Sequence, residues 1–215
     1  MRSILSHIVG SDRESAFEFA EVIRAEIFSA ERLEQHAASL AAAQTVTTRP
    51  VAVRPLTARL RHNHRALLDA HRAIAKSIAS GGAITPAAEW LVDNYHVVEA
   101  QIRQVRDDLP PGYYRQLPKL ADGPLAGYPR VLGLAWAFVA HTDSRFDANL
   151  LRQFVAAYQR VQPLTIGELW AIAITLRIVL IENLRRAAEL IASRRAVRGI
   201  RRRAPRPCAA AAPLK

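Results

Sequence analysis

The side chains of this sequence whose types and spacing could do chemistry form a few small groups. Glu89, Asp93 and His96 are spaced i, i+4 and i+7, so on a helix they would share one face and resemble half of a metal or acid–base site. The apolar residues of the same stretch would lie almost opposite, at Leu91, Tyr95, Val98, Ile102 and Val105. The three polar residues are therefore predicted to form a solvated face without a metal or catalytic role.

Two further groups contain histidine. His62 and His64 alternate, a spacing that suits ligands on a strand but not on the helix predicted there, and His71 adds no carboxylate to them. All three are predicted to be surface histidines. His141 and Asp143 form a His-x-Asp pair that could orient a proton-transfer group, but the sequence places no nucleophile beside it. Asp143 is therefore predicted to be a turn or cap residue.

Arg177 stands out because it interrupts an apolar stretch of a predicted helix. Its guanidinium is always charged and must reach either water or an ionic partner. We predict a buried charge in a structural ion pair, with Glu168 and Asp143 as the two candidate partners. Glu182, in contrast, is predicted to form an ordinary exposed pair with an arginine one turn further on.

Recognisable catalytic motifs are absent from the sequence. It contains neither a glycine-rich phosphate loop nor a nucleophile elbow. The single cysteine, Cys208, can build neither an internal disulfide nor a cysteine zinc cluster. We therefore predict no catalytic, cofactor-binding or metal-binding residue in this chain.

The positive charge is concentrated near the C-terminus. The chain has 30 basic and 19 acidic residues, and eight of the basic residues but none of the acidic ones follow Ser193. Such a tail could bind nucleic acid or an anionic membrane nonspecifically, although it lacks the interleaved aromatic residues of a nucleic-acid site. No apolar stretch reaches the roughly 20 residues that a membrane-spanning helix needs. We expect an intracellular protein.

The elements that must position these groups are helices, because alanine is abundant, only 9 residues are glycine, and capping boxes begin at Ser11 and Thr165. Apolar periodicity predicts six helices, at residues 12–43, 56–80, 86–108, 129–141, 147–161 and 165–198. The stretch 166–181 is apolar nearly all round, which predicts a central buried helix. The fold class is thus all-α, a multi-helix bundle of about six helices.

Two proline-rich segments interrupt the helices. Residues 45–55 are predicted to be an extended linker, and residues 110–130, with five prolines and three glycines, a long irregular segment that packs onto the body. The predicted division is an N-terminal helix in residues 1–44, this linker, a helical domain in residues 56–198 and a disordered basic tail in residues 199–215.

Beyond these patterns, the stretch from AEWLVDNYHVVEAQIRQVRDDLPPGYYRQLPKL to AHTDSRFD, residues 88–147, resembles the N-terminal region of cyclic β-1,2-glucan synthetases. The likeness covers about residues 59–195, from RLRHNHRALLDAHRAI onward, and the unusual PPGYYRQLPKL segment makes it more specific than a short motif. The resemblance implies large bacterial inner-membrane enzymes that make cyclic glucan from UDP-glucose, using a divalent metal in a transferase part. Only the region before that part is matched, so no family catalytic residue transfers to this chain.

The resemblance implies a non-catalytic helical module that packs against the remainder of the synthetase. We expect no cofactor in this chain, no specific nucleic acid, no transmembrane segment, and a location in the cytoplasm or at the periphery of the inner membrane. The closing GIRRRAPRPCAAAAPLK departs from the family, as expected of a truncated or frame-shifted gene. The alternative is a stand-alone helical interaction protein whose basic tail binds nucleic acid or anionic membrane. The predicted docking surface comprises Tyr113, Tyr114, Leu117, Leu120, Tyr128 and Trp136.

Overall fold

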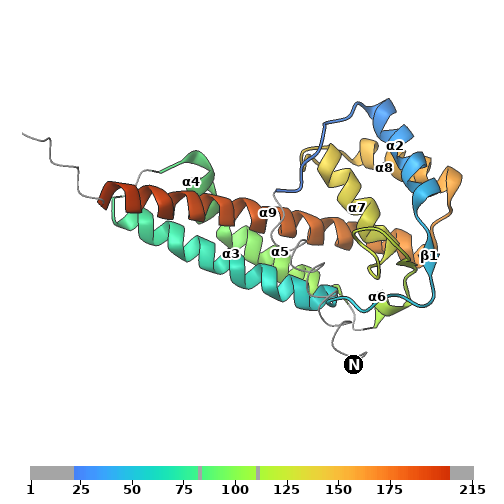
Figure 1. Ribbon diagram of the computed structural model, residues 1–215, viewed down its shortest axis with the longest axis horizontal. Helices are drawn as coiled ribbons and strands as arrows, with labels where there is room; N and C mark the ends of the chain where they lie inside the picture. The colour runs from blue at the N-terminus through green and yellow to red at the C-terminus, as the bar shows by residue number, and fades with distance from the viewer. Residues whose placement is uncertain (1–21, 82–83, 110–111, 204–215) are drawn as a thin grey trace, which may run out of the picture.

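The computed structural model describes residues 22–81, 84–109 and 112–203 of the chain. Within them it has eight helices and one small sheet, so the predicted all-α fold is confirmed with more helices than the six predicted (Figure 1). The elements are α2 (Ala30–Ala43), β1 (Val46–Thr47), α3 (Leu56–Ala79), α4 (Pro86–Asp93), α5 (Tyr95–Asp107), α6 (Tyr113–Gln116), β2 (Lys119–Leu120), α7 (Arg130–His141), α8 (Ala148–Val161) and α9 (Ile166–Arg203).

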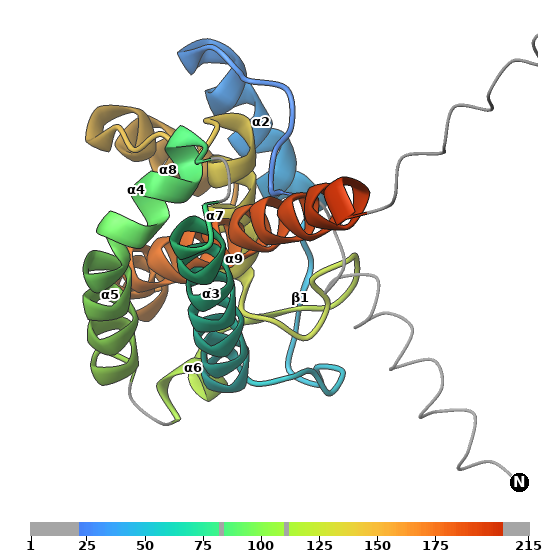
Figure 2. The same cartoon turned by 90° about the vertical axis from the view of Figure 1, so that its left-hand side faces the viewer.

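Two long helices, α3 and α9, form the axis of the molecule and run side by side in the same direction (Figure 1). On α3 the fully buried Leu60, Leu67 and Ile74 recur every seven residues, which gives the helix one apolar stripe. Viewed along this axis, α4 and α5 cover one side of the pair (Figure 2). The stripe on α3 is therefore closed off from solvent by its neighbours.

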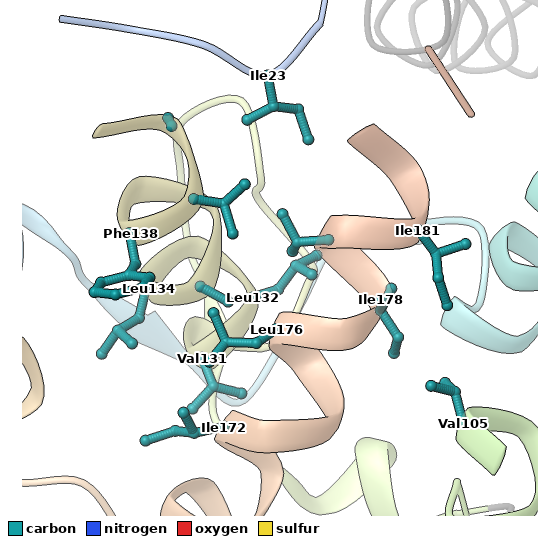
Figure 3. Close-up of a cluster of buried hydrophobic side chains, with 14 of the residues drawn as sticks. Ile23, Val105, Val131, Leu132, Leu134, Phe138, Ile172, Leu176, Ile178 and Ile181 are labelled. Atoms are coloured by element: carbon teal, nitrogen blue, oxygen red, sulfur yellow. The ribbon is translucent and has the colours of Figure 1, made fainter. Parts of the chain in front are cut away.

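The central core lies where α7 crosses α9. Leu132 of α7 and Leu176 of α9 lie between the two helices there, whereas Phe138 and Ile178 point away from this contact on either side (Figure 3). On the other side of α7, Phe138 packs against Phe154 of α8 with ring centroids 5.5 Å apart. Because α8 packs mainly against α2, these four helices build one end of the molecule.

The predicted helix over residues 12–43 is wrong for residues 22–29, which form an extended strap. The backbone N–H of Ala25 donates to Ala140 O at 3.0 Å and that of Phe28 to His141 O at 3.1 Å. These bonds to the open C-terminal end of α7 replace the helical ones. Helix α2 begins only after Ser29, whose hydroxyl accepts from the N–H of Arg32 at 3.3 Å. The predicted capping box at Ser11 lies outside the described residues.

The helix predicted over residues 86–108 is also corrected, because it breaks at Asn94. The side-chain amide of Asn94 donates to Trp90 O at 2.9 Å, a local bond that competes with the helical ladder and separates α4 from α5. At the other end of the chain α9 continues to Arg203 instead of stopping at residue 198. Residues 199–203 of the predicted tail are thus helical, and residues 204–215 lie outside the described chain.

The two proline-rich segments meet. Strand β1, in the predicted linker, pairs antiparallel with β2, with Val46 opposite Leu120. Nearby, Gly127 adopts a φ of +83°, and a Cβ there would lie 2.5 Å from Val51 O, so only glycine allows this close approach. The irregular segment therefore packs onto the body, as predicted, while the division into domains stays a prediction. Among the described helices, none is both long enough and apolar enough to cross a membrane.

Candidate functional site

The polar face of α4 and α5 has no ligand-binding geometry. Glu89, Asp93 and His96 are exposed, whereas the apolar residues of the opposite face are buried, as predicted. In the part of the chain that the structure describes, no three histidine, cysteine or carboxylate side chains come together in a way that could hold a metal ion.

The histidine groups are structural. His62 is exposed, but His64 and His71 are half-buried, and the His71 ring stacks on Tyr95 with centroids 4.2 Å apart, so the prediction of surface histidines holds only for His62. His141 does not pair with Asp143. Its Nδ1 lies 2.8 Å from Glu26 O in the strap.

Asp143 instead receives two hydrogen bonds from Arg24, at 2.8 Å each. These bonds hold the pKa of the Asp143 carboxyl below its ordinary value. Asp143 and Ser144 have φ of 51° and 62°, a left-handed turn that ends α7. The prediction of a turn residue is confirmed, and the ion pair with Arg24 ties the strap to this turn.

The prediction that Arg177 is a buried charge is wrong. Its side chain is 38% exposed and pairs with Asp108 at 3.6 Å, with neither Glu168 nor Asp143. The helix around it is apolar, but this face of α9 is open to solvent, so the guanidinium reaches water. Glu168 has another partner: Arg130 on α7 donates to it twice, at 2.8 and 2.7 Å, and both side chains are buried. Glu168 also closes the predicted capping box with Thr165.

The prediction that Glu182 forms an exposed pair is also wrong, because its side chain is only 5% exposed. It accepts from Asn63 at 2.9 Å and pairs with Arg59 of α3 at 3.1 Å and with Arg186 at 3.0 Å. Burial alone would raise the pKa of this carboxyl, but Arg59, the Asn63 bond and the neighbouring arginines lower it to about 2. This cluster joins α3 to α9 through one carboxylate, which is a structural role.

The six residues predicted to form a docking surface do not form an exposed surface. Leu117, Leu120 and Tyr128 are buried, and Tyr113, Tyr114 and Trp136 are half-buried against the chain's own core. The Tyr113 hydroxyl donates to Gly167 O, and the Trp136 ring lies under Arg186, whose guanidinium carbon is 5.0 Å from the ring centroid. The segment thus contributes to the chain's own core.

An apolar surface does open elsewhere, as a groove of about 650 Å³ between α8 and α9. Helix α9 supplies Leu169, Ala173, Leu176 and Leu180, spaced along one face, and α8 supplies Leu151, Val155 and Ala156. Phe146, which is 65% exposed, also lines the groove. On the same side of α9, Ile166 and Trp170 are 72% and 75% exposed. We call the residues that line this cavity the α8–α9 groove.

Sequence reasoning missed the groove because it treated residues 166–181 as buried all round. Trp170 and Ala173 are exposed because α8 packs against α2 and leaves this face of α9 uncovered. Among the described residues that line the groove, the polar side chains are Arg152, Gln159 and Arg177. The described lining of the groove is therefore mainly apolar.

Comparison with known proteins identifies a similar protein. No protein-family model matches the chain. The cyclic beta-(1,2)-glucan synthase NdvB of Rhizobium meliloti (strain 1021) is 43% identical over 187 residues, which is 87% of this chain. The same alignment spans only 6% of the length of that synthase. The resemblance seen in the sequence is therefore confirmed, as a match between this chain and one segment of a cyclic β-(1,2)-glucan synthase.

Proposed function

We propose that this chain is a non-catalytic helical module that docks onto the remainder of a cyclic β-(1,2)-glucan synthase through the α8–α9 groove. The observation that carries the proposal is the groove itself: apolar, about 650 Å³ in volume, and flanked by the strongly exposed Ile166 and Trp170. Large apolar side chains gathered on one face are typical of a surface that a partner covers. The match to one segment of a much larger synthase supports the remainder of such an enzyme as that partner.

The absence of a catalytic role is part of the proposal. In the described residues the buried carboxylates Glu168 and Glu182 are both neutralised by arginines. The pKa of Glu182, lowered to about 2, makes this carboxylate a poor general base at neutral pH. The donor UDP-glucose and a divalent metal are therefore proposed to bind in the transferase part, as the resemblance implies. The alternative of a basic tail that binds nucleic acid or membrane stays a prediction, since residues 204–215 lie outside the described chain.

Binding of the purified chain to the Rhizobium meliloti synthase, from which the matching segment has been deleted, tests this function. Ala156→Glu with Ala173→Glu places a carboxylate on each wall of the groove at exposed alanines. The matched control is Ala73→Glu with Ala100→Glu, which makes the same charge change at exposed alanines of α3 and α5. We expect the groove variant to bind at least about tenfold more weakly than the control, a loss of about 1.4 kcal/mol. Equal binding of the two variants would contradict docking through the groove.

A further inference from the structure

A second surface, at the beginning of α3, is unlike the groove because it is strongly basic. One cavity of about 430 Å³ is lined by Arg54, Ala58, Arg61, His62 and Arg65. A neighbouring cavity of about 370 Å³ also contains Arg54. We call the two together the basic cleft. It shares no lining residue with the α8–α9 groove.

The charges of the basic cleft all have one sign. Its larger-volume cavity contributes Arg61 and Arg65, the other cavity contributes Arg115 and Lys119, and no described residue that lines either cavity is a carboxylate. Arg61 and Arg65 are exposed, lie one turn apart and form no ion pair within the described residues. Like charges at this spacing repel each other and destabilise a helix. The surface is thus arranged to favour an anionic ligand.

The cavity that contains Lys119 adds an apolar interior. Leu56, Leu109 and Tyr128, all buried, form part of its lining, together with Tyr114 and Pro129. The Nζ of Lys119 donates to Tyr114 O, which keeps the ammonium group at this wall. A recessed apolar cavity next to a row of arginines can accept one inserted side chain and, beside it, a run of carboxylates. A flat lipid surface presents no side chain to insert.

We propose that the basic cleft binds an acidic peptide segment of a partner, with one apolar side chain in the cavity beside Tyr114 and carboxylates on Arg61 and Arg65. Charge complementarity selects the acidic residues, because Arg61, Arg65, Arg115 and Lys119 line the cleft and none of its described lining residues is acidic. The apolar cavity selects the neighbouring side chain, as in other peptide-recognition grooves where pockets give specificity. This site does not depend on docking through the groove.

The test uses the full chain and a fluorescein-labelled peptide, Phe-Glu-Glu-Asp-Glu-Glu, titrated by fluorescence anisotropy at low salt. We expect saturable binding that weakens with salt, and at least about tenfold weaker binding of the analogue in which every acid is the corresponding amide. Arg61→Glu with Arg65→Glu should weaken binding by at least about tenfold. A peptide with glycine in place of phenylalanine should also bind several-fold more weakly.

The matched control is Arg72→Glu with Lys76→Glu, the same charge change at exposed residues of the same helix outside the cleft. We expect this control to bind the peptide within about threefold of the unaltered chain, because its charges lie beyond the cavities. An equal loss of peptide binding in both variants would show that net charge alone attracts the peptide, and this result would overturn the site. Binding to phosphatidylserine vesicles without binding to the peptide would overturn it as well.

Discussion

Glu182 is the residue whose environment most determines how α3 and α9 are joined. One buried carboxylate faces Arg59 of α3 and Arg185 and Arg186 of its own helix. Removing one member of a buried ionic cluster leaves the others without compensation, which is far more costly than losing an exposed pair. The same residue read from the sequence alone is an ordinary i, i+4 partner. Its burial arises only when α3 packs against it, and sequence spacing carries no signal of that contact.

Replacing this carboxylate by an amide tests the role of the cluster. We expect Glu182→Gln to lower the free energy of unfolding by about 3–5 kcal/mol at neutral pH, measured by urea denaturation. Glu189→Gln is the control, because Glu189 pairs with Arg185 at 2.6 Å but is 46% exposed, and should cost about 1 kcal/mol or less. An equally small effect of both variants would show that Glu182 does not hold the helices together.

The lowered pKa of Glu182 also predicts a pH dependence. The pKa is about 2 in the folded chain against 4.5 for the free carboxyl, so the unfolded chain takes up the proton first as the pH falls. The stabilisation is fully present above about pH 4.5 and is lost progressively as the pH falls toward 2. Unfolding curves of the unaltered chain should show this loss. Glu182→Gln should show a shallower dependence on pH in the same window.

The pKa of His36 predicts a second change in stability, at a higher pH than the change that Glu182 causes. Its ring lies edge-on to Phe28 of the strap and 4.6 Å from the His141 ring, and burial followed by the charge of His141 lowers its pKa below the ordinary 6.5. The unfolded chain therefore binds the proton more readily, and stability falls as the pH drops below about 6.5. We expect His36→Phe to lose less stability between pH 7.5 and pH 5 than the unaltered chain. His62→Phe, at an exposed position, should retain the full dependence.

Among the elements, the strap is held as much by one side chain of α9 as by α7. Asn183 accepts from the N–H of Ile23 at 2.6 Å and donates to Ile23 O at 3.3 Å and to Ser144 Oγ at 2.8 Å. The buried Ile23 side chain lies above the core where α7 and α9 meet (Figure 3). This packing of an extended segment explains why the helical period of Ile23, Ile27 and Phe28 did not become a helix.

Asn183→Ala tests the attachment of the strap. The variant leaves the Ile23 N–H without its partner, a loss of about 1–3 kcal/mol for a buried donor. We expect hydrogen exchange at the amides of Ala25 and Phe28 to accelerate, because their bonds to the end of α7 depend on the strap staying in place. Exchange in α3 should stay slow. Unchanged protection at Ala25 would mean that Asn183 does not hold the strap.

At the scale of the whole molecule, the sequence predicted those helices that bury one apolar stripe and have clear signals at their ends. Helices α3, α7 and α8 begin and end within one or two residues of their predicted limits, because prolines, glycines and caps such as Asp147 mark them. Apart from the local break at Asn94, what failed depended on contacts between distant segments. The exposed face of α9 results from α8 packing on α2, and the predicted docking surface became core because β2 pairs with β1. Neither pairing leaves a signal in the sequence of one element.

The most direct test of the proposed module is glucan synthesis by a chimera in which this chain replaces the matching segment of the Rhizobium meliloti synthase. UDP release from UDP-glucose would be measured for the chain alone, for the chimera, and for the chimera carrying Ala156→Glu with Ala173→Glu. We expect no release by the chain alone, release by the chimera, and at least about tenfold less by its groove variant. Release by the chain alone, or full activity of the groove variant, would contradict a non-catalytic module that docks through the α8–α9 groove.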